Sequence, residues 1–358
     1  DIEKSLSSFP HQRILESDYR PVFLPRIQAK QSFVDLKDKQ RIAIQTWGKE
    51  DADVKIMCLH GWLDNSNTWN TFIPLLLEKS PVPLHIVAVD FAGHGWSSHR
   101  PPSSFYRLIQ HALDCFNVAS EIGWEEFTLL GHSMGGVVCT LMASLVPERI
   151  NRTVSVDTCG PYVYIRPGTS YGDFLAKDFI RAPQLWNRQP RVYASFEALF
   201  ERYRKNNMNL LEESAHLIVS RGVERVRIDD EVGEDLQQPS LQEKQTNSGQ
   251  YGYCFRHDPR CVGGKMDLFT EEMVASLFQR MRKPIMFVLA SRKARPQFHF
   301  IVELVKKRRN YLQNCECEIV VADGEHHIHL DHPERIMPSI LEFLSPLFYA
   351  PPPTKAKL

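Results

Sequence analysis

The sequence lacks a net charge. Its 358 residues include 43 lysines and arginines and 43 aspartates and glutamates, so the formal charge at neutral pH is zero. Nucleic acids and anionic membrane surfaces attract proteins mainly through an excess of positive charge. The balance removes the electrostatic case for either of these as a bulk partner and favours a small molecule.

Long hydrophobic runs are also missing, since none approaches the roughly 20 apolar residues that a membrane-spanning helix needs. The first residues are charged and contain no apolar core of the signal-peptide kind. The eight cysteines form no Cys-x-x-Cys pair, and several lie in apolar segments. We therefore expect no membrane span, and reduced structural cysteines in an intracellular setting rather than a disulfide framework.

What the sequence does contain is a Gly-x-Ser-x-Gly pattern at residues 131–135. Apolar residues 127–130 before it predict a strand, and residues 137–143 after it predict a helix. A strand, a sharp turn and a helix in this order are the context of a nucleophile elbow. The pattern predicts Ser133 as a nucleophile held above a sheet, at a helix N-terminus that favours developing negative charge. The alternative is a glycine-rich turn that happens to hold a serine.

Strands and helices alternate along most of the chain. This predicts an α/β fold with a mainly parallel sheet, helices on both faces and a ligand site at the carboxyl ends of the strands. The first two predicted strands form an antiparallel hairpin. The predicted strands are 32–36, 41–47, 54–59, 85–89, 127–130, 153–156, 284–289 and 318–321, and the predicted helices include 69–77, 105–122, 298–308 and 333–348.

The alternation stops after residue 157 and resumes only at residue 284. Residues 161–280 are rich in helix formers and aromatics, and strand character is missing from them. We therefore predict a core domain formed by residues 1–160 and 281–358, with residues 161–280 inserted as a helical cap or lid.

A loop at residues 59–64, Leu-His-Gly-Trp-Leu-Asp, follows the third predicted strand. In hydrolases with an elbow, backbone N–H groups from such a loop and from the residue after the nucleophile form the oxyanion hole. We assign these donors to Trp62 and Met134, which would act through the main chain. The alternative for the loop is an ordinary turn at a strand end.

A second loop, at residues 322–334, contains four histidines between the last strand and the last helix. A serine hydroxyl is a poor nucleophile until a neighbouring imidazole takes its proton, so this loop can supply the base. Four histidines also raise the question of a metal, but the loop shows none of the usual zinc-site spacings. We predict neither a metal nor a cofactor.

These motifs resemble the α/β-hydrolase superfamily, and in particular the serine hydrolase-like proteins of its dehalogenase and epoxide-hydrolase branch. The similarity includes the elbow, the 59–64 loop, Asp-x-x-Gly-His-Gly-x-Ser at residues 90–97, and the late histidine loop. Residues 253–260 also resemble the aromatic-Arg-x-Asp-Pro-Arg segment of this group. The resemblance implies an α/β-hydrolase fold with a mostly parallel central sheet flanked by helices and an inserted, mainly helical cap.

The resemblance also implies the rest of a catalytic triad. The base commonly lies seven residues before the proline that opens the last helix, and Pro333 then selects His326. The family acid usually follows the strand after the cap, yet residues 290–295 contain no carboxylate. Some members place it at the end of the preceding strand, which selects Asp157. Asp323 is only three residues from His326 and is expected to be too close along the chain to reach around the ring.

Serine rather than aspartate at the elbow predicts an acyl-enzyme formed from an ester, a thioester or an amide. The expected function is a cofactor-independent serine hydrolase, similar to a carboxylesterase, acting on a small-molecule acyl ester. The alternative is a catalytically degenerate hydrolase fold that binds a small molecule. The absence of an aspartate at residues 290–295 favours this alternative.

The last residues, Ala356-Lys357-Leu358, are a close variant of the Ser-Lys-Leu peroxisomal address and follow a proline run at 351–353. Such a run holds a signal clear of the fold. We expect recognition by a peroxisomal import receptor, with a cytoplasmic location as the alternative.

Overall fold

A computed structural model describes residues 12–15, 29–163, 170–186, 188–227, 251–262, 269–291 and 297–349. Its central feature is a nine-stranded sheet in the order β1-β11-β10-β7-β6-β4-β5-β3-β2. All neighbours in the sheet are parallel except the pairs β2–β3 and β3–β5. The strands are β1 (Gln12–Leu15), β2 (Lys30–Asp35), β3 (Arg41–Gly48), β4 (Val54–Leu59), β5 (Leu84–Val89), β6 (Phe127–His132), β7 (Ile150–Val156), β10 (Ile285–Ala290) and β11 (Cys317–Ala322).

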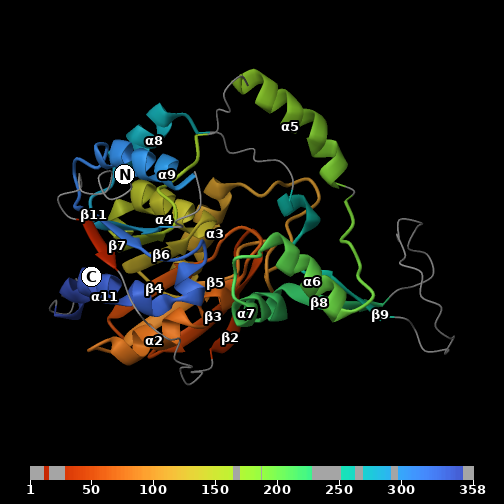
Figure 1. Ribbon diagram of the computed structural model, residues 1–358, viewed down its shortest axis with the longest axis horizontal. Helices are drawn as coiled ribbons and strands as arrows, with labels where there is room; N and C mark the ends of the chain where they lie inside the picture. The colour runs from red at the N-terminus through yellow and green to blue at the C-terminus, as the bar shows by residue number, and fades with distance from the viewer. Residues whose placement is uncertain are drawn as a thin grey trace.

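Helices cover both faces of the sheet (Figure 1). On one face lie α2 (Phe72–Lys79) and α11 (Met337–Phe348). On the other lie α3 (Leu108–Glu121), α4 (Met134–Leu145), α8 (Glu271–Phe278) and α9 (Gln297–Arg309). Alternate residues of β4 enter the two cores, Met57 on the α4 side and Cys58 on the α2 side. Burial on both faces explains why the parallel strands read as continuous apolar runs.

The segment between β7 and β10 is an insertion between two neighbouring strands of the sheet. It contains α5 (Tyr171–Trp186), α6 (Phe196–Asn206) and α7 (Glu212–Gly222), and the antiparallel pair β8 (Val223–Arg227) and β9 (Tyr251–Phe255) (Figure 1). Helix α8 also belongs to the range predicted as cap, and its Val274 and Phe278 pack into the core on the α4 side. The division into core and cap stays a prediction, and we call residues 161–280 the cap segment.

The hairpin and the buried strands predicted from the sequence are present within one to three residues of their predicted ends. The predicted helix at 69–77 is two elements, η1 (Ser66–Trp69) and α2, and the Asn65 side chain caps η1 by accepting from the backbone N–H of Asn67. Strand β1 was not predicted, because residues 1–30 show no periodicity. The remaining short helices are η2 (Pro147–Arg149), η3 (Pro259–Val262), α10 (Ile328–Asp331) and η4 (Pro333–Arg335).

Three expectations concern the chain as a whole. All eight cysteines are free, and six of them are buried. In the part of the chain that the structure describes, every helix is too short or too polar to cross a membrane. The tail at residues 356–358 lies outside the described residues, so peroxisomal import stays a prediction.

Candidate active site

Ser133 occupies the sharp turn between β6 and α4. Its backbone has φ 52° and ψ −116°, a strained conformation for a residue with a side chain. A Cβ at Gly131 would lie 2.4 Å from the Gly135 carbonyl oxygen, and a Cβ at Gly135 would lie 2.2 Å from the carbonyl oxygen of Leu59. Only glycine fits at either position, so the two glycines let α4 pack directly on the ends of β6 and β4.

His326 lies beside this serine, in the loop between β11 and α10. Its Nε2 is 3.0 Å from Ser133 Oγ, and its Nδ1 is 2.5 Å from Asp157 Oδ2. A carboxylate accepts hydrogen bonds, so the neutral ring carries its proton on Nδ1 and leaves the Nε2 lone pair for the serine hydroxyl. The imidazole is therefore oriented as a base toward Ser133.

Asp157 reaches the imidazole from the end of β7. Its Oδ1 accepts from the backbone N–H of Ala290 at 3.1 Å, and its own N–H donates to the Val288 carbonyl at 2.6 Å. The side chain is only 2% exposed, whereas that of His326 is 34% exposed. The acid is thus fixed by the last residues of β10, the strand paired with β7.

Asp323, the rejected alternative, contacts other residues. Its carboxylate is about half-exposed and accepts from Ser291 Oγ at 3.2 Å, with Arg335 at 3.6 Å. The structure therefore brings together Ser133, His326 and Asp157, the three residues predicted to form the triad.

The predicted oxyanion donors lie on two segments that pack together. A Cβ at Gly135 would lie 2.7 Å from the His60 carbonyl oxygen, which places the start of α4 against the loop that contains Trp62. Met134 is the first residue of α4, where a backbone N–H has no partner within the helix. The role of these two N–H groups in an oxyanion hole stays a prediction.

Three hydrogen bonds made by His60 and Trp62 fix this loop. His60 is fully buried, and its Nε2 accepts from the backbone N–H of Phe91 at 3.0 Å while Nδ1 donates to the Gly61 carbonyl at 2.7 Å. The Trp62 indole N–H donates to the carbonyl of Cys261 at 2.9 Å, so the side chain is turned toward η3.

Residues from the cap segment hold the loops around the site. Arg221 of α7 donates to Asp90 Oδ2 at 2.8 Å, and the same carboxylate accepts from the backbone N–H groups of Ser66 and Trp96. Asp258 accepts from the Tyr106 hydroxyl at 2.7 Å. These buried carboxylates orient loops and lie outside the hydrogen-bonded triad.

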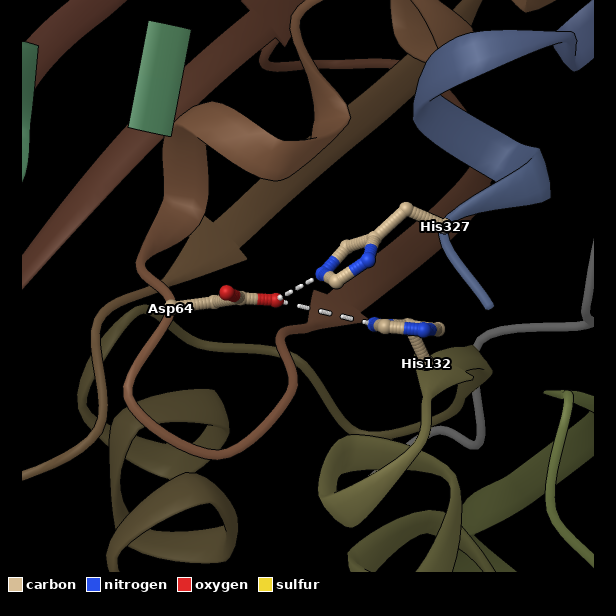
Figure 2. A group of neighbouring side chains, drawn as sticks. All are labelled: Asp64, His132 and His327. Atoms are coloured by element: carbon tan, nitrogen blue, oxygen red, sulfur yellow. Dashed lines mark hydrogen bonds and ion pairs between the residues drawn. The ribbon is translucent and has the colours of Figure 1, made fainter. Parts of the chain in front are cut away.

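A second group of ionisable side chains adjoins the triad, and the sequence did not predict it. His327 Nε2 lies 3.0 Å from Asp64 Oδ2, and His132 Nδ1 lies 3.7 Å from the same oxygen (Figure 2). Burial, together with the neighbouring imidazoles of the late loop, holds the pKa of His132 well below its ordinary value. Burial opposes the charged form of His327 too, but the carboxylates of Asp64, Asp331 and Asp157 together outweigh it and raise the pKa of His327. The three come from separate segments, so no spacing could have revealed them.

A small pocket opens beside this group. Its walls come from the 59–64 loop, the 90–97 turn and the cap segment, and the triad residues are not part of them. It is lined by Leu63, Asp64, Gly95, Tyr203, Ile218, Val219, Gly222, Phe255 and His257.

A serine on a strand-to-helix elbow, hydrogen-bonded to a histidine and an aspartate at the carboxyl ends of a parallel sheet, defines the class of α/β-hydrolase proteins. The chain belongs to the α/β-hydrolase fold family, whose family model matches residues 55–333.

Within this family the chain is similar to serine hydrolase-like proteins. One, from Dictyostelium discoideum, is 28% identical over 316 residues, which cover 85% of this chain and 78% of that protein. Another, from Danio rerio, is 29% identical, with 84% of each chain covered. A solved structure of a hypothetical protein from Pseudomonas aeruginosa PAO1 is 27% identical with a TM-score of 0.67, covering 90% of this chain and 100% of that one. Family and relatives together indicate a hydrolase.

Proposed function

We propose that the protein is a cofactor-independent serine hydrolase that cleaves a carboxylic ester or thioester through an acyl-enzyme on Ser133. The observation that supports this most directly is the pair of hydrogen bonds that links Asp157 through His326 to the Ser133 hydroxyl. A hydroxyl in this arrangement can lose its proton to the imidazole as it attacks.

The reaction would proceed in two halves. His326 Nε2 takes the Ser133 proton while Oγ attacks the acyl carbonyl, and the resulting imidazolium is stabilised by Asp157. The backbone N–H groups of Trp62 and Met134 would face the oxyanion. His326 then protonates the leaving alcohol or thiol, which departs. Water, deprotonated by the same imidazole, attacks the acyl carbonyl. The bond from the acyl carbon to Ser133 Oγ then breaks, His326 returns the proton to Oγ, and the acid is released.

The type of nucleophile and the charge of the chain support the proposed substrate class. An oxygen nucleophile forms an ester intermediate, which water can hydrolyse by the same route in reverse. The zero net charge of the chain gives no electrostatic preference for a polyanionic substrate. We infer a small-molecule acyl ester or thioester.

A fluorophosphonate probe tests the proposal. The wild-type protein should be labelled, and Ser133→Ala should remove both labelling and hydrolysis of p-nitrophenyl and acyl-CoA esters of graded chain length. Ser291→Ala, a nearby serine hydrogen-bonded to Asp323, is the matched control and should keep both.

Two results would contradict the proposal. Labelling that persists in Ser133→Ala would place the nucleophile elsewhere. A folded wild-type protein that neither reacts with the probe nor hydrolyses any ester would favour a hydrolase fold that serves as a small-molecule binding protein.

A further inference from the structure

Asp64, His132 and His327 form a cluster separate from the triad. They come from the loop after β4, the end of β6 and the loop after β11, and their side chains converge on one point (Figure 2). One ligand atom from each, namely Asp64 Oδ2, His132 Nδ1 and His327 Nε2, lies within 4.8 Å of the other two. His326 uses its two ring nitrogens for Asp157 and Ser133, so the catalytic imidazole is not needed to complete the cluster.

His132 presents an unpartnered lone pair to this cluster. Its Nε2 lies 2.8 Å from the His326 backbone carbonyl, which can only accept, so the ring proton is on Nε2. Nδ1 is then an acceptor, and it faces the acceptor Asp64 Oδ2 at 3.7 Å with no hydrogen-bond partner. The side chain is fully buried, and a buried acceptor without a partner is unfavourable, which a bound cation would relieve.

Gly61 lies directly against two of the ligand atoms. A Cβ built on this residue would lie 2.9 Å from both Asp64 Oδ2 and His132 Nδ1, which is too close for a carbon atom. Because residue 61 is glycine, no side-chain atom of its own covers these two ligand atoms. Asp64 also lines the small pocket described above.

We propose that Asp64, His132 and His327 bind a divalent transition-metal ion of the zinc class. Two imidazole nitrogens and one carboxylate oxygen are a typical three-ligand zinc set that leaves a fourth position for water. Magnesium and calcium prefer oxygen ligands. A tetrahedral ion with bonds of about 2.1 Å holds its ligand atoms roughly 3.4 Å apart. Asp64 Oδ2 lies 3.0 Å from His327 Nε2 and 3.7 Å from His132 Nδ1, and these two distances lie on either side of this value.

The environment of His132 matches that of a metal ligand. Its second ring nitrogen donates to the His326 carbonyl, and such a hydrogen bond fixes the tautomer and the orientation of a metal-bound imidazole. An ion at this point links three segments, which carry the predicted oxyanion donor, the nucleophile and the base. Metal binding is therefore expected to stabilise the folded protein.

Zinc uptake by the chelator-treated full chain tests the proposal. Titration against a chromophoric zinc chelator should show one tightly bound equivalent for the wild type. Asp64→Asn and His327→Gln, both close in shape to the originals, should each weaken binding about 100-fold or more. His332→Gln is the control from the same loop and should bind like the wild type. Cobalt(II) in place of zinc should give the strong visible bands of tetrahedral coordination.

Zinc binding and hydrolysis are tested separately, because Ser133→Ala should bind zinc with wild-type affinity. Circular dichroism of each variant verifies that it is folded, and the buried His132 need not be replaced. The proposal is overturned if the wild type takes up no zinc. It is also overturned if folded Asp64→Asn and His327→Gln bind like the wild type, or if Ser133→Ala abolishes binding.

Discussion

At the scale of single residues, the position of the acid is the feature that distinguishes this site. The resemblance led us to expect an acid after β10, whereas Asp157, the predicted acid, lies after β7. Strands β7 and β10 are adjacent and parallel, so their carboxyl ends lie side by side. A carboxylate from either strand can reach the same imidazole. The Ala290 N–H holds Asp157 at this point, which explains how the site accommodates the change.

Asp157→Asn should lower kcat for ester hydrolysis by about 10⁴-fold. An amide at this position cannot stabilise the imidazolium and favours the wrong tautomer of His326. Steady-state kinetics with a p-nitrophenyl ester, after verifying the fold, measures the effect.

Asp323→Asn is the matched control for this variant, because the Asp323 side chain contacts Ser291 and Arg335 rather than the ring. It should retain most of the activity. A large loss in Asp323→Asn with little change in Asp157→Asn would move the acid to Asp323.

At the scale of elements, the site depends on loops that are fixed by contacts with the cap segment. Helix α7 supplies Arg221, whose guanidinium also donates to Gln31 at 2.6 Å, and the Ile218 carbonyl of the same helix accepts from Asn65. Asp90, the partner of Arg221, is fully buried. The hydrogen bond between Arg221 and Asp90 joins α7 to the loop after β5, and the one between Ile218 and Asn65 joins it to the loop after β4.

Arg221→Ala should destabilise the protein by about 3–5 kcal/mol, because it leaves the Asp90 carboxylate buried without its cation. The Arg221 side chain is 3% exposed and that of Asp90 is not exposed at all, so solvent screens this pair little. Urea denaturation followed by circular dichroism measures the difference.

The exposed ion pair between Lys30 and Glu50 is the control for this prediction. Solvent screens such pairs, so Lys30→Ala should leave the denaturation midpoint nearly unchanged. Equal effects of the two substitutions would show that the contact between Arg221 and Asp90 is of no special importance.

Strands with a clear apolar pattern of their own were predictable from the sequence. Strands that form only because they pair with a distant segment were not. The strands 54–59 and 85–89 are apolar and short, and they match β4 and β5 closely. The strand β1 has no such signal, since it is defined by its pairing with β11. The two-stranded β8–β9 pair also arises from a long-range contact inside a segment that reads as helical.

At the scale of the whole molecule, the large core buries many imidazoles. Burial lowers the pKa of His111 to about 3 and that of His257 to about 4, and it also lowers the pKa of His60, His94 and His329. The ordinary value in an unfolded chain is about 6.5. The unfolded state therefore binds more protons below this pH, and stability is lost as the pH falls from about 6.5 toward 3. The raised pKa values of His327, Asp114 and Asp331 act in the opposite direction.

His111→Phe should reduce this acid sensitivity. The ring lies among Phe91, Tyr106 and His94, and phenylalanine fills similar space without a site for a proton. Relative to pH 8, the unfolding equilibrium constant at pH 5 should rise about 30-fold less in the variant than in the wild type.

Denaturant titrations at the two pH values measure this difference. At pH 8 His111 is neutral in both the folded and the unfolded state. A difference in stability between variant and wild type at this pH therefore measures the effect of packing phenylalanine in place of histidine. An identical loss of stability between pH 8 and pH 5 in variant and wild type would contradict the assignment.

The sequence by itself determined the order of strands and helices, the elbow at Ser133, and His326 as the favoured base, because each depends on residues that are close along the chain. Only the tertiary structure decided which carboxylate faces His326 and that Asp64, His132 and His327 meet at one point. These residues are far apart along the chain, so the sequence does not show how close they lie in space. The order of strands in the sheet brings their carboxyl ends together, and that order results from packing the complete chain.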